Sequence, residues 1–209
     1  MGAGIPKQFL ELAGRPVLMH AIQAFLNFAA DIRVVVVLPE AEFETWKRLC
    51  ETHRFHGSIQ LAISGPTRFH SVKNGLRHIP NEALVAIHDG VRPLVSLDTI
   101  SRVFHFASKF GNAIPATTPP DSVRTTDGAL SKALPRENVR LIQTPQCFIA
   151  SRIKKAYNRN YHESFTDDAS VLEADGERLF LVEGHRENIK ITTPSDLVFA
   201  EAYLADKRS

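Results

Sequence analysis

Two short segments of this 209-residue chain place charged side chains where they could do chemistry. Lys7 directly follows a proline, whose restricted backbone would hold the lysine at a defined exit from a loop. Asp89 and Arg92 follow an apolar run; an arginine fork suits a phosphate, and a carboxylate suits a hydroxyl or a phosphate that carries Mg²⁺. Asp89 and Arg92 could equally pair with each other and brace the turn.

A third segment, 64–68, is a glycine-containing turn before a predicted helix that bears Ser71. Gly65 would let the backbone approach a ligand closely, and the helix start would offer unpaired N–H groups to a base or a phosphate. A turn and an ordinary helix cap explain the same residues without a ligand. Further polar groups lie near strand ends or helix starts at 144–146, 166–168 and 188–190, and they are informative only if the fold brings them to one edge.

Several well-known catalytic signatures are missing from the sequence. It has no Gly-x-x-x-x-Gly-Lys-Ser/Thr loop, so it is not a Walker-type phosphate binder, and it has no His-Glu-x-x-His pair or Gly-x-Ser-x-Gly elbow. Cys50 and Cys147 form neither metal-ligand pairs nor a disulfide framework. Among nine histidines only His88, beside Asp89, is suggestive, and a lone histidine at a strand end is more often structural.

Helices and strands alternate in the spacing of the apolar residues. The β-branched run Val34–Leu38 is typical of a strand buried on both faces, as in parallel sheets. The alternation predicts an α/β fold whose mostly parallel sheet is flanked by helices, with ligands at the edge where the strands end. Predicted helices cover 18–28, 43–50, 69–79, 97–110 (capped by Ser96 and closed by Gly111), 153–157, 167–175 (capped by Thr166) and the residues after Thr193; predicted strands cover 34–38, 59–64, 83–88, 113–117, 146–148, 178–182 and 188–192.

The alternation breaks at Thr118, where two prolines and an aspartate signal a turn. Segments 122–125 and 138–142 are β-like, with a turn at 126–128 between them, and they are too polar for a core strand pair. We therefore predict a projecting hairpin, the arm, over residues 118–142. An isolated two-stranded arm is marginally stable in water, so we expect it to lean on a second subunit; a surface loop is the alternative.

Composition restricts the class of protein further. With 44% hydrophobic and 23% charged residues, the chain has the composition of an ordered globular domain, and its length predicts one domain over residues 1–209. A net charge of +2 does not predict a nucleic-acid binder. No apolar run is long enough for a membrane span and no secretory signal is visible, so with only two cysteines we expect a reduced, cytoplasmic setting.

Six motifs occur in the order and spacing of one enzyme family. They are Pro-Lys-Gln-Phe at 6–9, Ser-Gly-Pro-Thr-Arg-Phe-His-Ser-Val at 64–72, His-Asp-Gly-Val-Arg-Pro at 88–93, Thr-Pro-Gln-Cys-Phe at 144–148, Thr-Asp-Asp-Ala-Ser at 166–170 and Glu-Gly-His-Arg-Glu-Asn-Ile-Lys-Ile-Thr at 183–192. Through them the chain resembles, over nearly its whole length, the 2-C-methyl-D-erythritol 4-phosphate cytidylyltransferases of the non-mevalonate isoprenoid pathway. The resemblance implies a Rossmann-like, GT-A-like nucleotidyltransferase fold.

The resemblance also implies a reaction and a set of roles. CTP and 2-C-methyl-D-erythritol 4-phosphate would give 4-diphosphocytidyl-2-C-methyl-D-erythritol and diphosphate, with Mg²⁺ held through the CTP phosphates and the arm forming a homodimer. Lys7 and Lys190 fall on catalytic positions. The cytidine side falls on Gly65, Arg68 and Ser71; the acceptor side falls on Asp89, Arg92, Thr144 and Thr166; and the arm would supply Arg136, with Ser122 in place of a frequent threonine, to the other subunit.

The family begins with a strand and a glycine-rich loop bearing an arginine, whereas this sequence begins at the Met-Gly that precedes the Pro-Lys-Gln motif. That strand would lie in the middle of the sheet, so we expect residues upstream of Met1. Two alternatives share these motifs: a ribitol-5-phosphate cytidylyltransferase, and a nucleotide-binding regulatory protein that has lost turnover.

Overall fold

The computed structural model describes residues 4–29 and 31–207, in which local sequence sets the helix ends. Ser96 accepts a hydrogen bond from the backbone N–H of Thr99 at the start of α4, and Gly111 ends that helix with φ +93°, a conformation that glycine adopts without strain. The helices are α1 Val17–Phe28, α2 Phe43–Thr52, α3 Arg68–Leu76, α4 Leu97–Phe110, α5 Ala150–Ala156, α6 Asp168–Ala174 and α7 Pro194–Asp206. No helix among the described residues is long and apolar enough to cross a membrane.

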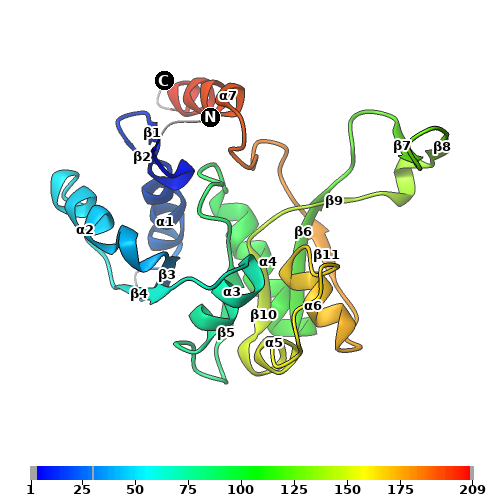
Figure 1. Cartoon of the computed structure of the whole chain (residues 1–209), viewed down its shortest axis with the longest axis horizontal. Helices are drawn as coiled ribbons and strands as arrows, with labels where there is room; N and C mark the ends of the chain where they lie inside the picture. The colour runs from blue at the N-terminus through cyan, green and yellow to red at the C-terminus, as the bar shows by residue number, and fades with distance from the viewer. Residues whose placement is uncertain (1–3, 30, 208–209) are drawn as a thin grey trace.

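The strands form two main groups, one on each side of the body (Figure 1). The larger sheet has the order β11-β6-β10-β5, with β9 on the other edge of β6, and the smaller pairs β3 with β4. The strands in these groups are β3 Val34–Leu38, β4 Ile59–Ile63, β5 Leu84–Ile87, β6 Asn112–Thr117, β9 Leu141–Ile142, β10 Gln146–Ile149 and β11 Leu181–Glu183; a short pair, β1 Glu11–Leu12 with β2 Arg15–Pro16, precedes α1.

The predicted α/β class is confirmed, but the sheet is mixed rather than mostly parallel. β10 runs antiparallel to both β5 and β6, whereas β11 runs parallel to β6. Consequently β5, β6 and β11 point the same way, and their carboxyl ends share an edge with the start of β10. Periodicity cannot reveal strand direction, because the alternation of side chains is the same in parallel and antiparallel ladders.

Burial of the predicted core strands is less complete than the sequence suggests. In β3 only Val36 and Leu38 are buried, since β3 pairs with β4 alone and packs one face against Trp46 and Phe55. β5 is half-buried along its length. The buried cluster with the most residues instead surrounds β10 and the short helices α5 and α6, where Phe148, Ile153, Tyr157 and Leu172 are enclosed.

One predicted helix cap and one predicted strand are wrong. Asp167, not Thr166, caps α6, because its carboxylate accepts from the backbone N–H of Ser170 and completes a capping box with that serine. Residues 188–192 form no strand; the carbonyl of Asn188 accepts from the Arg92 guanidinium instead of from a strand partner. Thr193 caps α7 as predicted, with Pro194 in the first turn.

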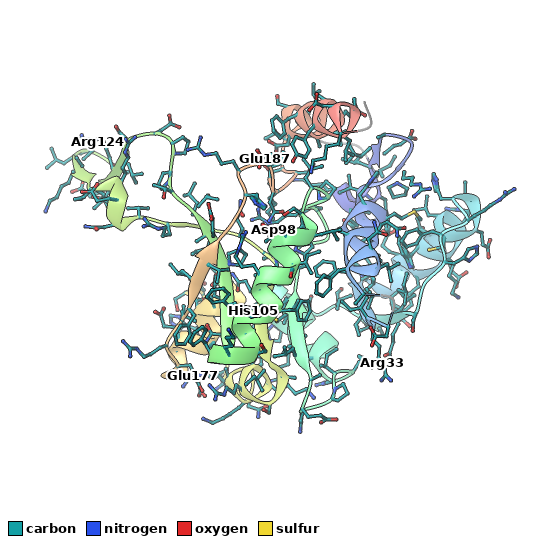
Figure 2. The ribbon with its side chains drawn as sticks, turned by 180° about the vertical axis from the view of Figure 1, so that it is seen from behind. Arg33, Asp98, His105, Arg124, Glu177 and Glu187 are labelled. Atoms are coloured by element: carbon teal, nitrogen blue, oxygen red, sulfur yellow. The ribbon has the colours of Figure 1, made fainter. Side chains whose placement is uncertain are left out.

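The arm projects far from the body, and Arg124 lies near its outer end (Figures 1 and 2). Its hairpin joins β7 Val123–Thr126 to β8 Ser131–Leu134, so the predicted hairpin pairing of 122–125 with 138–142 is wrong. The chain reverses immediately after β7, where Gly128 has φ +100° and the Leu130 carbonyl accepts from Asp127. Residues 138–142 instead lead back to the body, where β9 pairs with β6.

Candidate functional site

Asp89 is the centre of a charged cluster at the carboxyl end of β5. Its carboxylate lies 3.1 Å from Nε of Arg92, 3.3 Å from Nζ of Lys190 and 3.6 Å from Nε of Arg68. Burial opposes its ionisation, but the three cations outweigh burial and hold the pKa of Asp89 below its ordinary value. The local Asp89–Arg92 pair expected from the sequence is therefore present, as one part of a larger network.

Arg68, at the first position of α3, connects this cluster to a buried acid. Its two terminal nitrogens donate to the two oxygens of Asp168, at 2.9 and 2.6 Å, and the Tyr157 hydroxyl donates to the same carboxylate at 2.6 Å. Asp168 is fully buried. Burial disfavours the charged form of Arg68, but the carboxylates of Asp168 and Asp89 outweigh burial and raise the pKa of Arg68 above its ordinary value. For Tyr157, burial and the Asp168 carboxylate act together and raise the pKa.

Three chain segments meet because of how the strands pair. Gln146 of β10 lies opposite Ile87 of β5, so Thr144 comes beside the turn that follows β5. The Thr144 hydroxyl accepts from the backbone N–H of Asp89 at 3.0 Å. The segment after β11 reaches the same place, where the Asn188 carbonyl accepts from the Arg92 guanidinium at 2.8 Å. The polar groups at 144–146 and 188–190 thus converge on one edge, as the functional interpretation requires.

A cleft of about 390 Å³ opens beside this cluster. Six of the predicted site residues line it: Arg68, Asp89, Arg92, Thr144, Thr166 and Lys190. Its charged lining consists of three cations, Arg68, Arg92 and Lys190, and three carboxylates, Asp89, Asp167 and Glu173. The side chains that line the cleft therefore carry no net positive charge.

Lys7 does not line this cleft, but its side chain contacts the segment that carries Lys190. Its ammonium group is exposed and donates to the Thr192 carbonyl at 3.1 Å, two residues beyond Lys190. The segment 190–192 thus brings the two lysines toward the same region.

Gly65 and Ser71 form a local structure next to α3. The Gly65 N–H lies 3.0 Å from the Ser71 hydroxyl, and Thr67 caps the helix. A side chain at position 65 would place its Cβ 2.3 Å from that of His70, so the close approach of α3 requires glycine there. These contacts fit the simpler interpretation of a turn and a helix cap. The same turn leads directly into Arg68, the first residue of α3.

Ser122 and Arg136 lie on the arm, apart from the cleft. Both are exposed, and the Arg136 guanidinium donates to the Pro120 carbonyl at 3.2 Å. The described chain brings neither residue to the cleft, so the prediction that they act in another subunit stays a prediction.

Sequence reasoning missed the residues that support the site from behind. Asp168 and Tyr157 hold Arg68, and Asn188 is fully buried with its side-chain amide on the Thr144 carbonyl at 2.8 Å. Gln146 is also buried; its amide donates to Asp167 and its oxygen accepts from the backbone of Ala169. The polar motifs contain Asp168, Asn188 and Gln146, but not Tyr157, and a sequence pattern does not show which polar side chains face inward.

Asp196 stabilises the segment that contacts Lys7. Its carboxylate accepts from the backbone N–H groups of Thr192 and Thr193, at 2.8 and 2.7 Å, and these bonds lower the pKa of Asp196 to about 2. Because the folded pKa lies below the unfolded value of about 4, the stabilisation is present above pH 4 and disappears as the pH falls through 2.

We expect Asp196→Asn to lower the free energy of unfolding by about 1 kcal/mol at pH 7, since a charged acceptor is replaced by a neutral one. Urea denaturation at pH 7, 4 and 2.5 measures the effect, and the difference from wild type should shrink at each step. A difference that stays constant over this range would contradict the role of the ionised carboxylate.

Cations beside a carboxylate, at the carboxyl ends of strands in an α/β fold, form a candidate site for phosphorylated ligands at the edge of the sheet. Comparison with known proteins specifies the family. The family model described as 2-C-methyl-D-erythritol 4-phosphate cytidylyltransferase matches residues 1–206. The chain therefore belongs to this family of nucleotidyltransferase enzymes.

Relatives and solved structures agree over nearly the full chain. The enzyme named 2-C-methyl-D-erythritol 4-phosphate cytidylyltransferase from Phocaeicola vulgatus is 46% identical over 204 residues, which are 98% of this chain and 93% of that protein. The crystal structure of the cytidylyltransferase from Thermus thermophilus has a TM-score of 0.81 at 34% identity, covering 97% of this chain and 95% of that one. A synthase structure from Anaerococcus prevotii has a TM-score of 0.85 at 30% identity, covering 98% and 92%.

Proposed function

We propose that this chain transfers the cytidylyl group of CTP to 2-C-methyl-D-erythritol 4-phosphate and releases diphosphate. Membership of the family and full-length relatives of that name support the reaction. An oxygen of the acceptor phosphate attacks the α-phosphorus of CTP, forming a P–O bond as the bond to the β-phosphate oxygen breaks. The second pKa of a phosphate monoester is about 6, so the nucleophile is largely ionised at pH 7 and needs no general base.

The single observation that carries the assignment of the cleft is the convergence of Arg92 and Lys190 on Asp89. In the proposal, these two cations hold the acceptor phosphate in line with the α-phosphorus, and Asp89 sets their positions and accepts from a polyol hydroxyl. Thr166, which is exposed at the cleft wall, adds a hydroxyl on the acceptor side. Lys7 and Lys190 are proposed to stabilise the charge that develops at the reacting phosphates.

The cytidine side of the proposal rests on the turn before α3. Gly65 and Ser71 present a compact backbone there, and Arg68 stands between this turn and Asp89. Both terminal nitrogens of Arg68 are already bound to Asp168, so we assign Arg68 to shaping the nucleotide side rather than to binding a phosphate.

Mg²⁺ is proposed to enter with CTP. The described residues contain no group of three or more His, Cys, Asp or Glu side chains that could hold a metal ion. The carboxylates of the cleft are also engaged, Asp89 by three cations and Asp167 by the α6 cap. Mg²⁺ binds readily through phosphates and retained waters, so the protein need not supply a carboxylate cage.

We further propose a homodimer in which the arm of one subunit supplies Arg136 and Ser122 to the acceptor site of the other. The balanced charge of the cleft supports this, because the lining of a single chain offers no excess of positive charge to an incoming phosphate. A cytoplasmic location is proposed as well; Cys50 and Cys147, both unpaired thiols in the structure, suit a reducing compartment.

The reaction is tested by the release of diphosphate from CTP with a panel of acceptors. We expect turnover with 2-C-methyl-D-erythritol 4-phosphate and at most weak turnover with ribitol 5-phosphate. A preference for ribitol 5-phosphate would reassign the acceptor, and no turnover with any acceptor would favour the regulatory alternative.

We expect Arg92→Lys to lower kcat/KM for the acceptor about 10–100-fold, mainly through KM, because lysine keeps the charge but loses the planar fork. KM for CTP should change less than about threefold. Arg77→Lys, an exposed position at the end of α3, is the matched control. An unchanged KM for the acceptor would contradict the placement of Arg92 on the acceptor phosphate.

A further inference from the structure

Four residues, two of which line the cleft, are linked in a closed ring of hydrogen bonds. Nε2 of His88 lies 3.0 Å from the Arg92 carbonyl, and the Arg92 guanidinium donates to the Asn188 carbonyl at 2.8 Å. The Asn188 amide donates to the Thr144 carbonyl at 2.8 Å, and the Thr144 hydroxyl lies 3.0 Å from Nδ1 of His88. The ring ties together the turn after β5, the start of β10 and the segment after β11.

The direction of each bond follows from its partners. A carbonyl can only accept, so Nε2 of His88 must carry the proton that it donates to Arg92. The Thr144 hydroxyl accepts from the Asp89 N–H, which leaves its own proton for Nδ1 of His88. Every residue then donates to the next around the ring, so each of the four is held by two hydrogen bonds of defined direction.

The ring requires a neutral imidazole. A proton on Nδ1 would face the Thr144 oxygen and leave the hydroxyl proton without this acceptor. Burial, the main cause, lowers the pKa of His88 to about 4; Asp89 opposes this effect and the charge of Arg92 adds to it. The imidazole also packs against the Phe25 ring in an edge-type contact, with ring centroids 5.3 Å apart.

His88 and Asn188 do not line the cleft, whereas Arg92 and Thr144 do. We propose that His88 is a positioning residue: as a neutral imidazole it closes the ring that fixes Arg92 and so presents the guanidinium to the acceptor phosphate. The last step of this proposal rests on the proposed function. The Thr144 hydroxyl bridges the Asp89 N–H and the His88 imidazole, so in this proposal it acts on the site by positioning these two residues.

Kinetics of two substitutions at His88 test the link to the acceptor. His88→Phe keeps a ring against Phe25 but removes both nitrogens, and His88→Gln keeps a donor near the position of Nε2. We expect His88→Phe to raise KM for the acceptor about 10–100-fold with KM for CTP within about threefold, and His88→Gln to lose less. The control is His105→Gln on α4 (Figure 2), an exposed histidine. Equal changes in both KM values, or none, would overturn the proposal.

Thr144 variants test the ring itself. Thr144→Val removes the hydroxyl, whereas Thr144→Ser keeps it. The KM for the acceptor of the serine variant should therefore lie much closer to the wild-type value than that of the valine variant. Because His88→Phe and Thr144→Val share one broken bond, the fold-loss of the double variant should be smaller than the product of the two single losses. Losses that multiply would show that the two residues act independently, and would overturn the ring.

Nitrogen NMR of histidine-labelled protein gives a readout that needs no turnover. The His88 resonance, assigned by its loss in His88→Gln, should show a protonated Nε2 and a bare Nδ1, and should remain so at about pH 5, above its lowered pKa. A proton on Nδ1, or titration near pH 6.5, would overturn the ring even if turnover is normal. If the spectrum agrees but no acceptor is turned over, the proposed function fails and the ring stands.

Discussion

Lys7→Ala is expected to lower kcat about 10²–10³-fold while KM for CTP changes less than about threefold. The physical reason is that the reaction brings a phosphate anion to a triphosphate, and catalysis then depends on cations that match the charge spreading over the α-phosphate. Lys7 is poised for this task, since its ammonium is exposed and held by the Thr192 carbonyl beside the segment that carries Lys190. Steady-state kinetics with each substrate varied in turn measure the effect.

Lys47→Ala is the matched control, because Lys47 is an exposed lysine paired with Glu44 at 2.6 Å and lies on α2. This variant should retain wild-type kcat. A Lys7→Ala enzyme with normal kcat and raised KM for CTP would show that Lys7 binds the ground state, and would contradict its role at the transition state.

Arg136→Ala alone should nearly abolish turnover at low acceptor concentration, but mixing it with Lys7→Ala should restore about one quarter of wild-type activity. If Arg136 acts in the partner subunit, random exchange makes half of the dimers hybrid. Each hybrid then has one complete site, built from the intact Lys7 of one chain and the intact Arg136 of the other. If Arg136 acted within its own chain, every site in the hybrid would lack one residue.

The measurement is diphosphate release after subunit exchange, with hybrid formation checked by differently tagged chains. Arg124→Ala is the control on the same arm; Arg124 lies at the outer end of the hairpin (Figure 2), where its guanidinium bonds Ser131. Mixtures of Arg124→Ala with Lys7→Ala should simply average the two activities. Hybrids that form and show no restored activity would contradict action in trans.

The charge balance of the cleft links these two predictions. Three cations and three carboxylates line the cleft. Their charges cancel, so the lining of a single chain has no excess of positive charge. Lys7 and Arg136 are the two predicted cations outside that balance, and both are exposed. Their removal should therefore affect the reacting phosphates more than it affects the fold.

Much of the fold followed from the sequence because its signals are local. Apolar spacing predicted α1, α4 and α7. Ser96 caps the start of α4, Gly111 ends it, and Thr193 caps α7, through contacts with residues only a few positions away in the chain. The arm was predictable too, because a polar β-like segment cannot be a core strand. Its second strand was misplaced, since β9 is a strand only through its pairing with β6.

The sequence by itself determined the class of the fold, the family and six of the residues that line the cleft, because motif order and apolar spacing can be read from the chain without its three-dimensional structure. Only the tertiary structure decided how those residues are used. The antiparallel β10 puts Thr144 beside His88 and Asp89, and the segment after β11 adds Asn188 to them. Hydrogen bonds across 44 to 100 residues of chain, such as that between Asn188 and Thr144 or between Arg68 and Asp168, have no local signal. They depend on which side chains the packed strands turn inward.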